Sequence, residues 1–179
     1  EVVTQDGRRR LRIDGDRLAF LDGDLERWLP MTTAAELAEA TGAHLGAPSS
    51  IYEPETSLDP GAPLDVDAAA SERLAAWLDL VADALEVVRG AHADDAPAIT
   101  QLWPEHFDLA CSLREVNLGG SLGDDAHPEP YLYVGPWQPR QGRFWNEPWG
   151  AGLLSGSVPD VDAAVAFFER GLDEATRRS

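Results

Sequence analysis

The chain has 179 residues, of which 44% are hydrophobic and 26% charged, which is typical of one globular domain with its own core. Its 32 acidic and 14 basic residues give a net charge of −18, which argues against nucleic-acid binding and against anionic membranes, because both need clustered positive charge. One cysteine excludes an intramolecular disulfide, and no apolar run reaches the roughly 18 residues of a membrane span. With no signal-peptide pattern, these features favour a cytoplasmic protein.

The first predicted elements are three short strands. Residues 8–21 alternate apolar and polar side chains on either side of Asp14-Gly15-Asp16, which has the composition of a hairpin turn. A second turn at Asp22-Gly23-Asp24 leads into a short strand over residues 25–29. This part of the sequence therefore predicts a small antiparallel hairpin with a third strand.

Helices are predicted at three places. Thr33 and Glu36 have the spacing of a capping box, which predicts a short helix that ends at Gly42. The clearest helix is a long central one over about 67–89, where apolar residues recur at steps of three and four. A C-terminal helix over about 160–176 has the same periodicity, so both helices should bury one face.

Further strands are predicted near residues 106–116, 131–135 and 150–154, with a turn-rich loop over residues 118–130. Strands and helices occur in blocks and do not alternate along the chain. This order favours the α+β class with a largely antiparallel sheet, packed with the central and C-terminal helices, over a doubly wound fold. We expect residues 1–179 to form a single domain.

The strand near residues 106–116 has one apolar and one polar face. His106 and Asp108 are two residues apart, so both side chains leave the polar face, where the next side chains are small. His127 and Glu129 repeat this spacing, and strand pairing would bring the two pairs together. Two imidazoles and two carboxylates suit a divalent metal ion, or general acid–base catalysis. The alternative is that these four side chains have structural or solvated roles.

An aromatic loop over residues 135–149 is placed to cover that polar face. We expect Tyr133, Trp137 and Trp145 to form the stacking walls of a ligand pocket, with Asn146 as a polar contact. The alternative is a lid that packs on the core. Cys111 belongs to the apolar strand face, which predicts an inert core residue.

Two segments resemble a group of uncharacterised bacterial proteins that are classed as a domain of unknown function. They are Leu102-Trp103-Pro104-Glu105-His106-Phe107-Asp108-Leu109-Ala110 and His127-Pro128-Glu129-Pro130-Tyr131-Leu132-Tyr133-Val134. The resemblance mainly covers residues 100–175 and implies no activity. It implies that Asp108 and His127 match positions of that group, and that a further segment precedes Glu1.

Three functions stay open at this point. The chain could be an enzyme that acts on a small molecule, hydrolysis being the least demanding reaction. It could be a non-enzymatic module that binds a small ligand or a protein through the same pocket. It could also be an acidic interaction protein that has no pocket.

Overall fold

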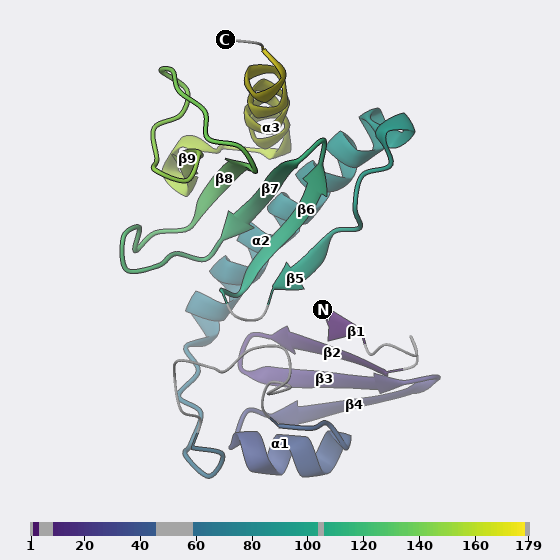
Figure 1. The fold of residues 1–179 in the computed structure, drawn as a ribbon. Helices are drawn as coiled ribbons and strands as arrows, with labels where there is room; N and C mark the ends of the chain where they lie inside the picture. The colour runs from purple at the N-terminus through teal and green to yellow at the C-terminus, as the bar shows by residue number, and fades with distance from the viewer. Residues whose placement is uncertain (1, 4–8, 46–58, 104–105, 178–179) are drawn as a thin grey trace. The chain divides into compact units, whose positions relative to one another are not determined.

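The computed structural model shows an α+β protein with antiparallel sheets of four and five strands (Figure 1), as the sequence predicts. The structure describes residues 2–3, 9–45, 59–103 and 106–177. The chain divides into two compact units, Glu1–Arg73 and Leu74–Ser179, which are described in turn. The single domain expected from the sequence stays a prediction. Within the described ranges, no helix has the length and apolar character needed to cross a membrane.

The first unit contains the four-stranded sheet, in the order β1-β2-β3-β4, and a short helix. Its elements are β1 (Val2–Val3), β2 (Arg9–Asp14), β3 (Arg17–Asp22), β4 (Leu25–Pro30) and α1 (Ala34–Thr41). Gly15 and Gly23 form the two turns with φ of 59° and 60°. The Thr33 hydroxyl accepts from the backbone N–H of Glu36 at 3.2 Å, and Gly42 ends α1 with φ 66°. The predicted turns and helix cap are therefore confirmed.

The second unit contains a five-stranded meander in the order β5-β6-β7-β8-β9. Its strands are β5 (Gln101–Trp103), β6 (Asp108–Leu113), β7 (Val116–Ser121), β8 (Tyr131–Pro136) and β9 (Ala151–Leu154), and its helices are α2 (Ala68–Ala91), which begins in the first unit, and α3 (Val161–Thr176). Short 3-10 helices cover Ala93–Asp95 and Ser155–Ser157. Figure 1 shows α2 crossing one face of this sheet.

An aspartate side chain caps the first turn of each long helix. Asp67 accepts from the backbone N–H of Ala70 at 2.9 Å, and Asp160 accepts from Ala163 at the same distance. A carboxylate here satisfies an N–H that has no partner within the helix. The end predicted for α2 is wrong by two residues, because Gly90 stays helical and α2 continues to Ala91.

The core of the second unit lies between one face of the five-stranded sheet and the two helices. Its largest fully buried side chains come from both helices and from two strands, β7 and β8: Val81, Leu85, Val88, Leu118, Leu132, Val134, Phe168 and Leu172. Cys111 belongs to this core, as predicted, and burial raises the pKa of its thiol to about 11. The thiol is therefore protonated and inert at neutral pH.

The predicted strand over residues 106–116 and the loop after it are partly wrong. The chain reverses at Arg114 and Glu115, which both have positive φ (52° and 61°), and continues into β7. Positive φ is uncommon outside glycine and asparagine, so the sequence has no turn signal here. The Arg114 Nε donates to Asp95 at 3.0 Å, and Glu115 accepts from the backbone N–H of Trp137 at 2.9 Å. These contacts fix the turn.

Candidate functional site

The sheet face opposite the helices carries the polar residues of β6, β7 and β8. Strand pairing places Gly119 of β7 opposite Ala110 of β6 and Tyr133 of β8 on this face. A Cβ atom on Gly119 would lie 2.5 Å from the Tyr133 hydroxyl oxygen. The missing side chain therefore lets the Tyr133 ring lie across β7 and reach Asp108 on β6.

Asp108 is only 8% exposed, although it lies on the face without helices. Its Oδ2 accepts from the Tyr133 hydroxyl, while its Oδ1 is buried and has no hydrogen-bond partner among the described residues. Burial, followed by the bond to Asp108, raises the pKa of Tyr133 well above its ordinary value. Tyr133 is thus a proton donor and not a base at neutral pH.

A second tyrosine–carboxylate pair lies beside the first. The Tyr131 hydroxyl donates to Asp124 Oδ2 at 2.7 Å, while Asp124 Oδ1 accepts from the backbone N–H groups of Ala126 and His127 at 2.8 and 2.7 Å. The Tyr131 hydroxyl, followed by these backbone bonds, lowers the pKa of Asp124. Burial, followed by the bond to Asp124, raises the pKa of Tyr131 to about 12.

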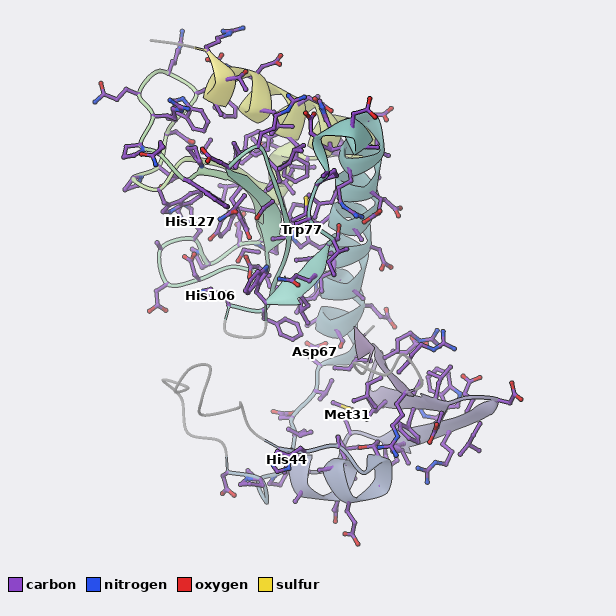
Figure 2. All side chains as sticks on the ribbon, turned by 45° about the vertical axis from the view of Figure 1, so that its right-hand side comes forward. Met31, His44, Asp67, Trp77, His106 and His127 are labelled. Carbon is purple, nitrogen blue, oxygen red and sulfur yellow. The ribbon has the colours of Figure 1, made fainter. Side chains whose placement is uncertain are left out.

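His127 joins the loop after β7 to the loop before β9. Its Nε2 lies 3.1 Å from Glu147 Oε1, and its Nδ1 is buried without a hydrogen-bond partner in the described part of the chain. Nδ1 lies 3.7 Å from Asp124 Oδ1, which is close enough for an ion pair but too far for a hydrogen bond. Figure 2 shows His127 on the side of the sheet away from α2.

The Trp149 ring covers these groups. Its centroid lies 6.5, 6.1 and 6.3 Å from the rings of His127, Tyr131 and Tyr133. We call the whole set the tyrosine–carboxylate cluster, which consists of Asp108, Asp124, His127, Tyr131, Tyr133, Glu147 and Trp149. The buried Asp108 carboxylate, the more accessible carboxylates of Asp124 and Glu147, an imidazole and protonated hydroxyls can together bind a hydrogen-bonding ligand or transfer protons.

The structure brings together only part of the predicted acid–base set. Asp108 and His127 belong to the cluster, linked through the tyrosines. His106 and Glu129 are exposed, and neither forms a hydrogen bond or ion pair with a residue that the structure describes. Among the described residues, no three or more His, Cys, Asp or Glu side chains form a group that could hold a metal ion. The described side chains therefore offer no ligand set for the divalent metal.

The three aromatic residues predicted to line one ligand pocket lie in different surroundings. Tyr133 belongs to the cluster, whereas Trp145 packs against the hydrophobic core. Trp137 is 59% exposed and donates through Nε1 to Asn117 at 3.0 Å. The Asn146 amide exchanges two hydrogen bonds with the backbone of Gly152, at 3.0 and 3.1 Å, so it anchors the loop to β9.

Four cluster residues are absent from the site predicted from the sequence. Tyr131 shares a strand face with Tyr133 two residues later, and that spacing could have identified it. Asp124, Glu147 and Trp149 come from loops, where no periodicity shows which side chains meet.

The cavity shown by the structure lies elsewhere. It has a volume of about 450 Å³ and is lined by residues of the aromatic loop, β9 and α3. The sequence predicts a pocket between residues 106–116 and the aromatic loop over residues 135–149. The cavity is lined by that loop, including Asn146, but by no residue of 106–116 and by none of the cluster. Comparison with models of protein families, with curated proteins and with solved structures gives no match.

Proposed function

We propose that the chain binds a small organic molecule at the tyrosine–carboxylate cluster, and that Asp108 accepts a hydrogen bond from an N–H or ammonium group of this ligand. The observation that carries the proposal is the buried Asp108 Oδ1, which has no partner among the described residues. A buried carboxylate oxygen without a donor is costly, so a ligand that supplies the donor gains that energy on binding.

The surroundings of Asp108 favour a donor with positive charge. Asp124 and Glu147 add two further carboxylates to the cluster, and the chain as a whole carries −18. The rings of Tyr131, Tyr133 and Trp149 add faces on which an organic cation can lie. An amine or guanidine with a small body fits this combination better than an anion does.

Two features beside the cluster support access by a ligand. Trp149 is 41% exposed and belongs to a loop, and we infer that movement of its side chain admits the ligand. Phe107, directly before Asp108, has φ 51°. This conformation costs a bulky residue about 1–3 kcal/mol, and such strain concentrates at functional sites.

A thermal-shift series with methylammonium, agmatine, guanidinium and acetamide tests the proposal, because a ligand that binds only the folded chain raises Tm. We expect a cationic compound to stabilise the chain and an Asp125→Asn control, but not Asp108→Asn. Asp125 is exposed and neighbours the cluster. Equal shifts in Asp108→Asn and Asp125→Asn, or no shift with any compound, would contradict the proposal.

A second candidate is hydrolysis with His127 as the general base. When Nε2–H donates to Glu147, the lone pair of Nδ1 is free, and Nδ1 has no hydrogen-bond partner in the described structure. This carboxylate–imidazole pairing orients many catalytic histidines. In this role His127 Nδ1 would take a proton from water, which requires Trp149 to move and expose this buried nitrogen.

Assays with p-nitrophenyl esters and amides test the second candidate. His127→Gln should lower the rate by about 10²–10⁴-fold, the range for loss of a general base. His44→Gln is the matched control, because His44 is exposed and lies in the first unit. No turnover by the unmodified chain, or equal turnover by both variants, would exclude hydrolysis of these substrates through His127.

A further inference from the structure

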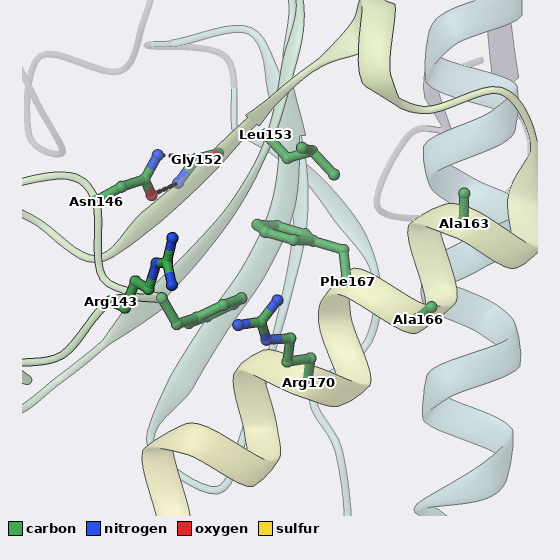
Figure 3. Close-up of a pocket in the computed structure, with 9 residues that line it drawn as sticks. Arg143, Asn146, Gly152, Leu153, Ala163, Ala166, Phe167 and Arg170 are labelled. Atoms are coloured by element: carbon green, nitrogen blue, oxygen red, sulfur yellow. Dashed lines mark hydrogen bonds between the residues drawn. The ribbon is translucent and has the colours of Figure 1, made fainter.

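The cavity in the second unit is open at the protein surface and has a polar rim (Figure 3). Its volume of about 450 Å³ is within the range of small-molecule sites. Nine residues line it: Arg143, Phe144, Asn146, Gly152, Leu153, Ala163, Ala166, Phe167 and Arg170. They come from the aromatic loop, from β9 and from α3, all of which belong to the second unit.

Arginine supplies all the charge of the lining. Figure 3 shows Arg143 on the aromatic loop and Arg170 on α3, and both line the cavity. Neither forms an ion pair with an acidic residue that the structure describes, and none of the nine lining residues is acidic. Two guanidinium groups without a carboxylate attract an anion and present parallel N–H donors to it.

The floor of the cavity is aromatic. The rings of Phe144 and Phe167 lie 5.5 Å apart between centroids, and the Arg170 guanidinium lies 4.9 Å from the centre of the Phe144 ring. This stacking orients the guanidinium without using its hydrogen-bond donors. The donors of Arg170 therefore stay available beside an apolar surface of two rings.

The remaining polar groups of the rim already form hydrogen bonds within the protein. The Asn146 side chain and the Gly152 backbone satisfy one another through two hydrogen bonds. These bonds hold the loop that carries Arg143 and Phe144 against β9. The specificity of the cavity thus rests on the two arginines and the two phenylalanines.

We propose that this cavity binds a small organic anion, with its carboxylate or phosphate group on Arg143 and Arg170 and its aromatic body on Phe144 and Phe167. The chain carries −18 overall, so it repels anions in general, and a lining with two arginines and no acidic residue marks a local exception. This site shares no residue with the tyrosine–carboxylate cluster and takes a ligand of opposite charge.

Calorimetric titration of the full chain with phenyl phosphate, benzoate and inorganic phosphate tests the proposal. We expect phenyl phosphate and benzoate to bind, with affinity that falls as salt rises. Arg143→Gln and Arg170→Gln should each weaken binding by about tenfold, because each removes a charged hydrogen-bond donor. Arg140→Gln is the control, since Arg140 lies in the same loop but does not line the cavity.

Amide chemical shifts locate the bound anion. We expect phenyl phosphate to shift the amide signals of Gly152, Leu153 and Phe167 and to leave that of Asp108 unchanged. Absence of binding at millimolar concentrations, or equal binding by the two arginine variants and the control, would overturn the proposal. Inorganic phosphate binding as tightly as phenyl phosphate would overturn the aromatic part of the site.

Discussion

Asp108 depends on a single tyrosine hydroxyl. Its carboxylate is buried, and the only hydrogen bond it accepts within the described structure comes from Tyr133. Asp124, by contrast, is exposed and accepts from two backbone N–H groups as well as from Tyr131. Without its tyrosine, Asp124 would keep two backbone hydrogen bonds and contact with solvent, whereas Asp108 would have no donor among the described residues. The two tyrosines should therefore differ in how much they stabilise the fold.

Replacing Tyr133 with phenylalanine leaves a buried carboxylate with no donor from the described residues. We expect Tyr133→Phe to lower the free energy of unfolding by about 1–3 kcal/mol, the usual cost of an unsatisfied buried polar group. Urea unfolding followed by circular dichroism measures the change. Tyr131→Phe removes the same atom from the neighbouring pair and should cost less. Equal losses would contradict the dependence of Asp108 on Tyr133.

The hydrogen bond between Tyr131 and Asp124 should stabilise the fold over a bounded pH range. The lowered pKa of Asp124 makes its contribution complete above the ordinary carboxyl value near 4, and the contribution disappears as pH falls through the lowered pKa. Because the pKa of Tyr131 is raised to about 12, its contribution is complete below the ordinary tyrosine value near 10 and is lost as pH rises toward 12.

The difference in unfolding free energy between the unmodified chain and Tyr131→Phe should therefore be constant from about pH 5 to 9 and shrink outside this range. Urea unfolding at a series of pH values measures it. Tyr133→Phe, measured over the same pH series, is the control. A change in stability with pH that occurs only in Tyr131→Phe belongs to the pair of Tyr131 and Asp124. A difference that varies within the neutral range would contradict the assignment.

At the scale of elements, the sequence predicts structure best where a local signal decides it. The turns at Gly15 and Gly23 and the helix start at Asp160 follow from short-range chemistry, and the structure confirms them. Gly119 and Gly120 suggest a loop by composition, yet they are part of β7. Tyr133 and Val81 fill the space of their missing side chains, and both lie far away in the sequence.

The site is harder to predict than the fold, because its residues meet through long-range contacts and not through local signals. Strand alternation correctly places Asp108 on the face opposite the helices. His127 meets Glu147 and not Glu129, because the loops after β7 and before β9 meet only in the folded sheet. No periodic pattern in the sequence contains that contact. Loop partners of this kind need the three-dimensional structure.

Close packing between β7 and α2 depends on Gly120. A Cβ atom there would lie 2.4 Å from Cγ2 of Val81, so we expect Gly120→Ala to destabilise the chain by about 1–3 kcal/mol. Urea unfolding gives the value. Gly90→Ala is the control, because a Cβ atom there meets nothing within 4 Å and alanine favours a helix by about 1 kcal/mol.

Val81→Ala tests whether a clash with the Val81 side chain causes the loss of stability in Gly120→Ala. If the clash causes the loss, Gly120→Ala and Val81→Ala together should cost less than the sum of the single variants, because each removes part of the problem made by the other. Strictly additive costs would show that Gly120 matters for another reason, such as its backbone conformation.

At the scale of the whole molecule, 32 acidic residues face only 14 basic ones. The ion pairs on the surface, such as those of Arg9 with Asp22 and Arg114 with Asp95, are partly exposed and contribute little individually. Repulsion among the excess carboxylates should therefore exceed the attraction within these pairs. The arginine-lined cavity is a local departure from this acidic average.

Salt should consequently stabilise the folded chain. Raising NaCl from about 0.02 M to about 0.5 M shortens the distance over which carboxylates repel one another, so Tm should rise. Each kcal/mol of relieved repulsion corresponds to about 2–4 °C for a chain of this size. Choline chloride at equal ionic strength is the control, because it screens charge without offering a small metal cation. Both salts are applied to Asp108→Asn, so that the proposed site for an organic cation does not contribute. A similar rise in both salts supports general repulsion, a rise in NaCl alone indicates bound sodium, and a fall in both would show that ion pairs dominate.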